Sequence, residues 1–203
     1  MMSNRNKALL LIFSILVIDQ VVKIIIKTNM VIGEEIPVLG NWFRIHFLEN
    51  NGMAFGMEWG GKTGKVALSV FRMIAIAGIS WYLNGIIKKN APLGLILSVS
   101  AIIAGAAGNL IDSAFYGMIF SESWHTTAVL FPEGGGYSSF LHGRVVDMLY
   151  FPVIDTQWPD WSPIRPGQSF IFFRPVFNLA DTSITTGVLA ILLFQKKFLG
   201  EHS

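Results

Sequence analysis

The pattern of hydrophobic and polar positions divides the chain into four long apolar segments joined by connections of unequal length. A hydrocarbon core about 30 Å thick requires roughly 20 helical residues to cross it. Four segments are long enough, at about 7–26, 66–87, 92–115 and 176–194. The sequence therefore predicts an all-α membrane protein with four transmembrane helices, organised as a single domain over residues 1–203.

Basic residues in the flanks of these segments predict their orientation, because Lys and Arg concentrate on the cytoplasmic side of membrane proteins. The short flanks carry Arg5, Lys7, Lys88, Lys89, Lys196 and Lys197. A four-span chain puts all these flanks on one side, so we expect both termini in the cytoplasm. The two long connections, about 27–65 and 116–175, are then expected to face outward.

The charged residues of the first two apolar segments need an explanation. The first could be a secretory signal peptide, since Arg5 and Lys7 precede it, but no small-residue cleavage site follows and Asp19 and Lys23 interrupt it. We therefore expect a transmembrane helix. The second contains Arg72, which we expect near the outer end, where a long basic side chain can reach the interface.

The two outward connections carry different patterns. Apolar and polar residues alternate over 42–48, which predicts a short strand, and the turn at 50–52 favours a small hairpin or β-cradle on the membrane surface. The second connection is rich in Gly, Pro and aromatic residues, and its Trp residues suit the headgroup zone. We expect it to form an interfacial loop or half-helix rather than a separate domain.

Composition supports the membrane prediction and narrows the chemistry. Only 14% of the 203 residues are charged and 52% are hydrophobic, whereas soluble domains carry about 25% charged residues. The net charge of +2 provides no basic surface for nucleic acid. The sequence contains no Cys, which excludes disulfides, thiolate metal sites and a Cys nucleophile.

Polar side chains of the apolar segments, together with Asp147 of the second connection, gather near the predicted outer face. At about 1.5 Å per helical residue, Asp19 lies about 18 Å from the cytoplasmic end of its segment. The remaining members lie nearer to the outer face: Asn109, Asp112, Asp147, Asn178 and Asp181. Ionisable groups in a membrane are costly and are therefore functional candidates, and scattered structural residues would not need to share a depth.

Structural roles also remain open for some of these residues. Asp19 and Lys23 are four residues apart and can form a local ion pair that lowers the cost of insertion. The two asparagines can serve as hydrogen-bond partners between helices. Asp147 and Asp181 have no matched basic residue beside them in the sequence, so they require a shared proton or a distant Arg.

Several familiar catalytic motifs are missing from the sequence. It contains neither a zinc-binding His-Glu-x-x-His motif nor a Gly-x-Ser-x-Gly nucleophile elbow, and its four His residues are scattered. An aspartate pair remains. Two close carboxylates cannot both ionise cheaply, so one holds a proton while the other acts as a base. Such a pair activates water against a peptide carbonyl without a metal or cofactor.

Five motifs occur in order along the chain. They are Asp19-Gln20-Val21-Val22-Lys23, Glu49-Asn50-Asn51-Gly52-Met53-Ala54-Phe55-Gly56, Gly108-Asn109-Leu110-Ile111-Asp112, Val145-Val146-Asp147 and Phe177-Asn178-Leu179-Ala180-Asp181. In this order on a four-span chain they resemble lipoprotein signal peptidase (signal peptidase II). The resemblance implies an aspartyl endopeptidase that removes signal peptides from precursor lipoproteins, before a diacylglyceryl-modified cysteine and without a metal or cofactor.

The resemblance also implies roles for individual residues. Asp147 and Asp181 correspond to the catalytic pair, and Asn178 to a residue that positions one carboxylate. Substrate-binding or supporting roles fall to Asp19, Lys23, Asn50, Gly52, Asn109 and Asp112. The turn at 50–55 is expected to form part of the wall that holds the lipid-bearing cysteine.

Two features depart from the family pattern. The family usually has Arg after the Asp of the third motif, whereas this chain has Ser113. We expect Arg144, three residues before Asp147, to supply the missing cation. The stretches 121–140 and 155–174 also look longer than the usual connection, which outward loops tolerate.

Location, partners and competing functions complete the expectations. We expect a monomer in the bacterial inner (cytoplasmic) membrane, with the active site near the outer face, and with lipid-modified precursors and membrane lipids as partners. The alternative is a small ion or proton transporter, which predicts acids in the cytoplasmic half, where the sequence has none because Asp19 is the deepest. A lipid-binding or assembly subunit predicts instead that Asp147→Asn and Asp181→Asn are silent.

Overall fold

The computed structural model describes residues 2–52, 61–172 and 174–199. The helices are α1 (Asn4–Asn29), α2 (Gly61–Lys88), α3 (Leu93–Ile111), the π-helix η2 (Asp112–Tyr116), α4 (Gly117–Ile119), α5 (Leu179–Leu193) and α6 (Gln195–Leu199). The strands are β1 (Glu35–Leu39), β2 (Phe43–Asn50), β3 (Val145–Tyr150), β4 (Ile154–Gln157), β5 (Ser169–Phe172) and β6 (Val176–Phe177).

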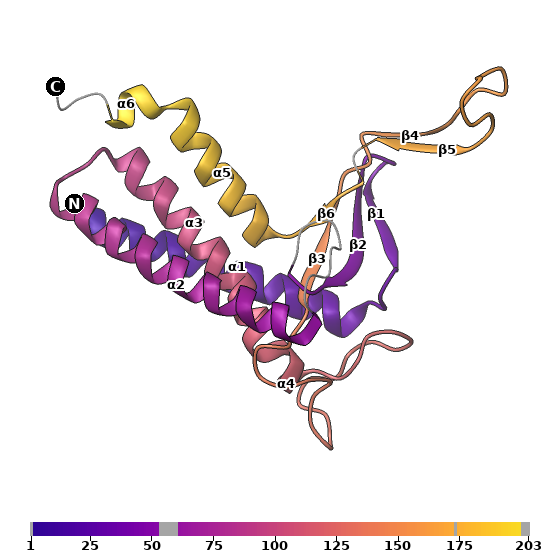
Figure 1. The fold of residues 1–203 in the computed structure, drawn as a ribbon, viewed down its shortest axis with the longest axis horizontal. Coiled ribbons are helices and arrows are strands. Elements are labelled where there is room, and N and C mark those ends of the chain that lie inside the picture. Colours follow the sequence, from indigo (N-terminus) through magenta and orange to yellow (C-terminus); the bar gives the residue numbers. More distant parts are fainter. Residues whose placement is uncertain (1, 53–60, 173, 200–203) are drawn as a thin grey trace.

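The long helices run alongside one another, and a β-sheet lies at one end of them (Figure 1). Both termini and the α2–α3 connection lie at the opposite end. Helix α3 packs against α1, α2 and α5 and is the central element. Its glycines allow close helix contact, because a Cβ added to Gly105 or Gly108 would meet atoms of Ala180 in α5.

Among the described residues, three helices are long and apolar enough to cross a membrane, at Asn4–Asn29, Thr63–Lys88 and Leu93–Ile119. The predicted first, second and third segments are therefore found, each a few residues longer than expected or continued through a π-turn. The fourth segment is shorter than predicted. Val176–Phe177 form strand β6 and Asn178 caps α5, so the helix has 15 residues and begins three residues later.

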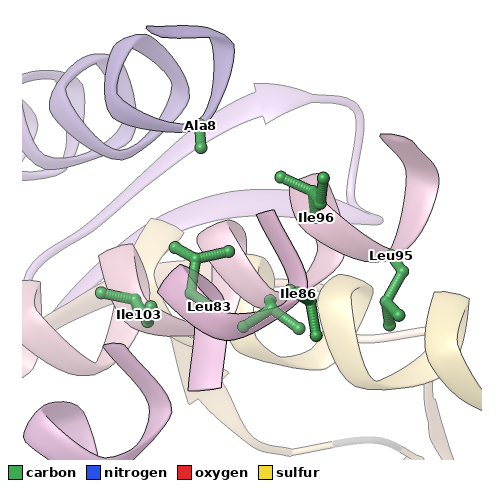
Figure 2. Close-up of a cluster of buried hydrophobic side chains, with 7 residues drawn as sticks. Ala8, Leu83, Ile86, Leu95, Ile96 and Ile103 are labelled. Atoms are coloured by element: carbon green, nitrogen blue, oxygen red, sulfur yellow. The ribbon is translucent and has the colours of Figure 1, made fainter. Parts of the chain in front are cut away.

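The end of the bundle that carries the termini is held together by aliphatic packing. Figure 2 shows a cluster contributed by α1, α2 and α3: Ala8, Leu83, Ile86, Leu95, Ile96, Val99 and Ile103. The outer surfaces of the helices are apolar as well, and Phe13, Phe71 and Trp81 are all exposed. An apolar exterior of this kind fits contact with lipid tails.

The sheet has the strand order β1-β2-β3-β6, and all neighbours are antiparallel. The strand predicted over 42–48 is found as β2. The turn at 50–52 does not close a hairpin, because β2 forms its hairpin with the preceding strand β1 and pairs on its other edge with β3. A second apolar cluster, which includes Phe47, Tyr116 and Met148, packs the sheet against the end of α1 and η2.

Of the expected loop or half-helix, the described residues of the second connection after α4 include no half-helix. After α4 ends at Ile119, the described residues up to Pro175 form strands and turns. The physical reason is that β3 completes the sheet beside β2 and leaves its backbone groups paired there. Strands β4 and β5 pair with each other and project from the sheet (Figure 1). The protein therefore combines apolar helices with a sheet larger than an all-α class allows.

Candidate active site

Asp147 and Asp181 approach each other where the sheet meets the helices, and Asn178 lies between them. Asp147 is in the middle of β3, and Asp181 is in the first turn of α5. The Asn178 Nδ2 donates to Asp147 Oδ1 at 2.8 Å, and the Asn178 Oδ1 accepts from the Asp181 backbone N at 2.8 Å. The second bond is the N-cap of α5, so the residue that begins the helix also joins the two aspartates.

The environment of Asp147 favours its protonated form. Its side chain is buried, with 4% of the residue exposed, and it accepts hydrogen bonds from Asn178 and Asn50. Burial, followed by the negative charge of Asp181, raises the pKa of Asp147 to about 7. A carboxyl group with this pKa exchanges its proton near neutral pH, which is what acid–base chemistry requires.

Asn109 supports the second carboxylate. Its Nδ2 donates to Asp181 Oδ1 at 2.8 Å. Its Oδ1 accepts from Asn178 Nδ2 at 3.1 Å and from Lys23 Nζ at 3.0 Å. The Asn109 side-chain amide is therefore held at both its oxygen and its nitrogen, and the nitrogen donates to Asp181.

Lys23 is the centre of a buried charge cluster behind the two aspartates. Its Nζ lies 2.9 Å from Asp19 Oδ2 and 2.8 Å from Asp112 Oδ2, and none of the three side chains is more than 1% exposed. Gln20 donates to Asp112 Oδ1 at 2.9 Å. Buried charges are tolerated only when they are paired and hydrogen-bonded in this way. The local ion pair between Asp19 and Lys23 is therefore present but is one part of a larger cluster.

The carboxylates of this cluster also fix the backbone beside the site. Asp19 Oδ1 accepts from the Ala180 backbone N at 3.0 Å. Asp112 Oδ2 accepts from the Val146 backbone N at 3.3 Å. Ala180 precedes Asp181 and Val146 precedes Asp147, so each aspartate of the pair follows a residue that a supporting aspartate holds in place.

The turn after β2 closes the other side of the site. Asn50 Nδ2 donates to Asp147 Oδ2, and Asn50 Oδ1 accepts from the Gly52 backbone N. Gly52 has a φ of +84°, a conformation that side chains disfavour. The expectation for 53–55 as a wall of the substrate site falls outside the described residues.

The structure places Arg144 away from the aspartate pair. Its guanidinium forms ion pairs with Glu49 at 3.1 Å and Glu122 at 2.8 Å and lies over the Tyr137 ring. Glu49 in turn pairs with the buried Lys27 of α1. The expectation that Arg144 compensates for Ser113 therefore does not match this geometry. Arg144 ties the long second connection to β2.

Two residues near the pair were missed from the sequence. Gln20 lies in the first motif but carried no charge to draw attention to it. Arg72 was expected to reach the interface, yet it donates to Gly52 O at 2.7 Å and to Ser113 Oγ at 3.4 Å. A charged residue in an apolar helix is itself a signal of function. That signal was available for Arg72.

Comparisons with known proteins identify the family to which the chain belongs. A family model described as signal peptidase (SPase) II matches residues 11–196. A lipoprotein signal peptidase of Porphyromonas gingivalis is 49% identical over 184 residues, which cover 90% of this chain and 80% of that protein. One of Amoebophilus asiaticus is 40% identical over 183 residues, covering 89% and 73%.

Two solved structures described as bacterial membrane enzymes share the fold. One has a TM-score of 0.60 at 24% identity, covering 97% of this chain and 92% of the other. The second has a TM-score of 0.58 at 26% identity, covering 94% and 93%. The apolar helices of the present chain, taken with these similarities, show that it is a membrane peptidase. The chain belongs to the signal peptidase II family.

Proposed function

We propose that this protein is an aspartyl endopeptidase that removes the signal peptide from diacylglyceryl-modified prolipoproteins, cleaving before the lipidated cysteine. The observation that carries the proposal is the pair Asp147 and Asp181, joined through Asn178 with the pKa of Asp147 raised to about 7. Within the described parts of the chain, no cation forms an ion pair with either carboxylate. The pair can therefore share one proton.

The proposed reaction needs only a water molecule and this proton. Asp181 takes a proton from water as the water oxygen attacks the peptide carbonyl carbon, and Asp147 gives its proton to the carbonyl oxygen. The tetrahedral intermediate then collapses. Its C–N bond breaks, the leaving amine takes the proton from Asp181, and the re-forming carbonyl returns a proton to Asp147. Both aspartates end in their starting states, without a metal or cofactor.

The supporting residues divide into two groups in this proposal. Asn50, Asn109 and Asn178 hold the carboxylates and leave substrate-facing positions between them. Asp19, Asp112 and Lys23 fix the backbone on which the pair stands. The turn that contains Gly52 lies beside Asp147, and we propose that it lines the site of the lipid-bearing cysteine.

We further propose the membrane arrangement expected from the sequence. The chain is a single four-helix domain with α1, α2, α3 and the shorter α5 as spans. Both termini are cytoplasmic, the sheet faces outward, and the active site lies near the outer face of a bacterial inner membrane. The separation of the termini from the sheet along the helices supports this (Figure 1). We propose that the protein acts as a monomer on lipid-modified precursors.

The transporter alternative is not supported. The chain belongs to a peptidase family. Its described membrane helices carry no acidic residue between Asp19 and the end of the bundle where the termini lie. An ion path across the membrane would need polar groups through that half.

Cleavage of a lipidated precursor peptide by the purified protein in detergent tests the proposal. We expect turnover by the wild type, none by Asp147→Asn or Asp181→Asn, and no effect of EDTA. Asp160→Asn is the matched control, because Asp160 is exposed in the loop between β4 and β5, and it should retain activity. Activity lost in EDTA would contradict the metal-free mechanism, and activity retained by both dyad variants would contradict the aspartyl assignment.

A further inference from the structure

Arg72 lies in the apolar helix α2 but directs its guanidinium into the active site. Its Nη2 donates to Gly52 O at 2.7 Å, and its Nη1 donates to Ser113 Oγ at 3.4 Å. Ser113 is buried, and its Oγ donates to the Asn109 carbonyl at 2.9 Å. A membrane helix tolerates a charged residue only where that residue has partners or a function. Arg72 has its partners on the two elements that flank the aspartate pair.

A chain of hydrogen bonds connects Arg72 to Asp147. The guanidinium holds the Gly52 carbonyl, the Gly52 backbone N donates to Asn50 Oδ1, and Asn50 Nδ2 donates to Asp147. A Cβ at Gly52 would lie 2.8 Å from Arg72 Nη1, so a side chain at this position would require the guanidinium to shift. The position of Asn50 therefore depends on a residue of α2.

Arg72 also contributes charge to the site. Its guanidinium lies near the negative charges of Asp181, Asp112 and Asp147. Its hydrogen-bond partners are a carbonyl and a hydroxyl, so the cation lies close to the pair without neutralising either carboxylate in a contact. Opposite charges at this range favour the ionised carboxylate.

We propose that Arg72 is a positioning residue for peptide cleavage, which fixes the Asn50–Gly52 turn against Asp147 and supplies the cation that residue 113 does not. This inference rests on the proposed peptidase function. Because Arg72 Nη1 lies 3.4 Å from Ser113 Oγ, a basic side chain at position 113 can bring its charge to the same place. The two positions are therefore interchangeable sources of one cation.

The first test compares Arg72→Gln with Arg72→Lys in the lipopeptide assay, with kcat and KM measured across pH. Arg72→Gln loses a hydrogen bond from a charged donor, so kcat/KM should fall roughly ten- to hundredfold. Its basic limb should move to higher pH, because removal of a cation raises the pKa of Asp147. Arg72→Lys keeps the charge, and its basic limb should match the wild type with a loss in kcat/KM under about tenfold.

The second test asks whether the cation can be moved. In Arg72→Gln/Ser113→Arg, kcat/KM should recover by about tenfold over Arg72→Gln, and the basic limb should return toward that of the wild type. A merely structural Arg72 predicts neither the shifted limb nor the recovery. The inference is overturned if Arg72→Gln changes neither kcat/KM nor the basic limb of the pH profile. It is also overturned if Arg72→Gln lowers kcat/KM without shifting the basic limb and Ser113→Arg does not restore kcat/KM.

Controls separate this inference from the proposed function. Arg165→Gln, a matched change at an exposed position between β4 and β5, should leave both readouts unchanged. A wild type that does not cleave the lipopeptide refutes the peptidase proposal, whereas an active wild type with an unaltered Arg72→Gln refutes only the role of Arg72. If Arg72→Gln does not fold, Arg72→Lys decides: an unshifted limb supports the inference and a shifted limb contradicts it.

Discussion

Two pairs of aspartates meet at one end of the helices, and they differ in the residue that joins them. Asp19 and Asp112 share the ammonium group of Lys23. Asp147 and Asp181 are joined by Asn178, whose neutral side-chain amide donates to the Asp147 carboxylate and accepts from the Asp181 backbone N. An ammonium group in contact with a carboxylate favours its ionised form more strongly than a neutral amide does. Burial and the charge of Asp181 raise the pKa of Asp147 to about 7.

The comparison indicates that the partner of each aspartate, and not burial alone, distinguishes the proposed supporting pair from the proposed catalytic pair. All four residues lie in or beside the same polar cluster, and Asp19 and Asp112 are at least as buried as Asp147. Each carboxylate of the Lys23 pair holds a backbone N–H next to a member of the reactive pair. Asp19 and Asp112 therefore hold the backbone beside Asp181 and Asp147 in place.

The largest expected effect comes from Asp181→Asn. Removal of one carboxylate leaves no base for water, so kcat should fall by at least about a thousandfold, as for other residues that act as a unit. The thermal unfolding midpoint in detergent should stay close to that of the wild type, since Asn can still cap the first turn of α5. Asp112→Asn should have the opposite pattern: its thermal unfolding midpoint should fall, while its kcat should fall less than that of Asp181→Asn. Equal losses of activity with equal losses of stability would contradict the division into two pairs.

Lys23→Met is expected to have the next largest effect, on stability. It leaves Asp19 and Asp112 buried without a cation, and breaking a buried ion pair from one side costs about 3–5 kcal/mol. The free energy of unfolding in mixed detergent micelles, or the midpoint on heating, measures this loss. Lys89→Met, at the exposed α2–α3 connection, is the matched control. A Lys23→Met protein as stable as this control would show that Lys23 does not hold the cluster together.

The raised pKa of Asp147 predicts a pH dependence of stability. The pKa of Asp147 is raised to about 7 in the folded protein, above about 3.9 in an unfolded chain. Between these values the folded state binds the extra proton, so its contribution to stability is present at low pH and is lost as pH rises toward 7. The loss should be roughly 2–4 kcal/mol.

Unfolding midpoints of the wild type and Asp147→Asn, compared from about pH 4.5 to 8, measure this contribution. The variant lacks the titrating group, so its midpoint should change less with pH over this range. Asp160→Asn, at an exposed position, should retain the wild-type slope. Parallel curves for the wild type and Asp147→Asn would show that Asp147 is not the group that titrates.

Local patterns predicted much of the fold, and the family motifs named most of the residues that meet at the candidate site. Apolar length was sufficient for α1, α2 and α3, and alternation was sufficient for β2. The start of α5 was misplaced because the apolar run continues through Val176–Phe177, while the pairing of β6 with β3 and the Asn178 cap decide where the helix begins. The sequence of a single strand does not indicate which distant strand it pairs with.

The same limit explains the arginine that sequence proximity selected. Arg144 lies three residues before Asp147, immediately before β3 begins at Val145. Successive side chains of an extended chain point to opposite faces, so an odd spacing directs these two side chains apart. The Arg144 side chain therefore meets Glu49 and Glu122 instead. Arg72 lies 41 positions from Ser113, and only helix packing brings them together. The residue types of the candidate site could be predicted from the sequence. Which of these side chains contact one another depended on tertiary packing.

The smallest expected effect is that of Gly52→Ala. Comparison with Gly33→Ala distinguishes the cost of a positive φ from the loss of the contact with Arg72. Gly52 and Gly33 both have positive φ, +84° and +88°, so replacement of either by Ala should lower stability by about 1 kcal/mol. A Cβ at Gly52 would press on Arg72, whereas a Cβ at Gly33 would have no atom within 4 Å. Gly52→Ala should therefore also lower kcat/KM, by roughly tenfold if about one hydrogen bond is weakened. Gly33→Ala should change only the unfolding midpoint. If both variants cleave the lipopeptide equally well, the turn does not need its fit against Arg72, and the link from α2 to the aspartate pair is wrong.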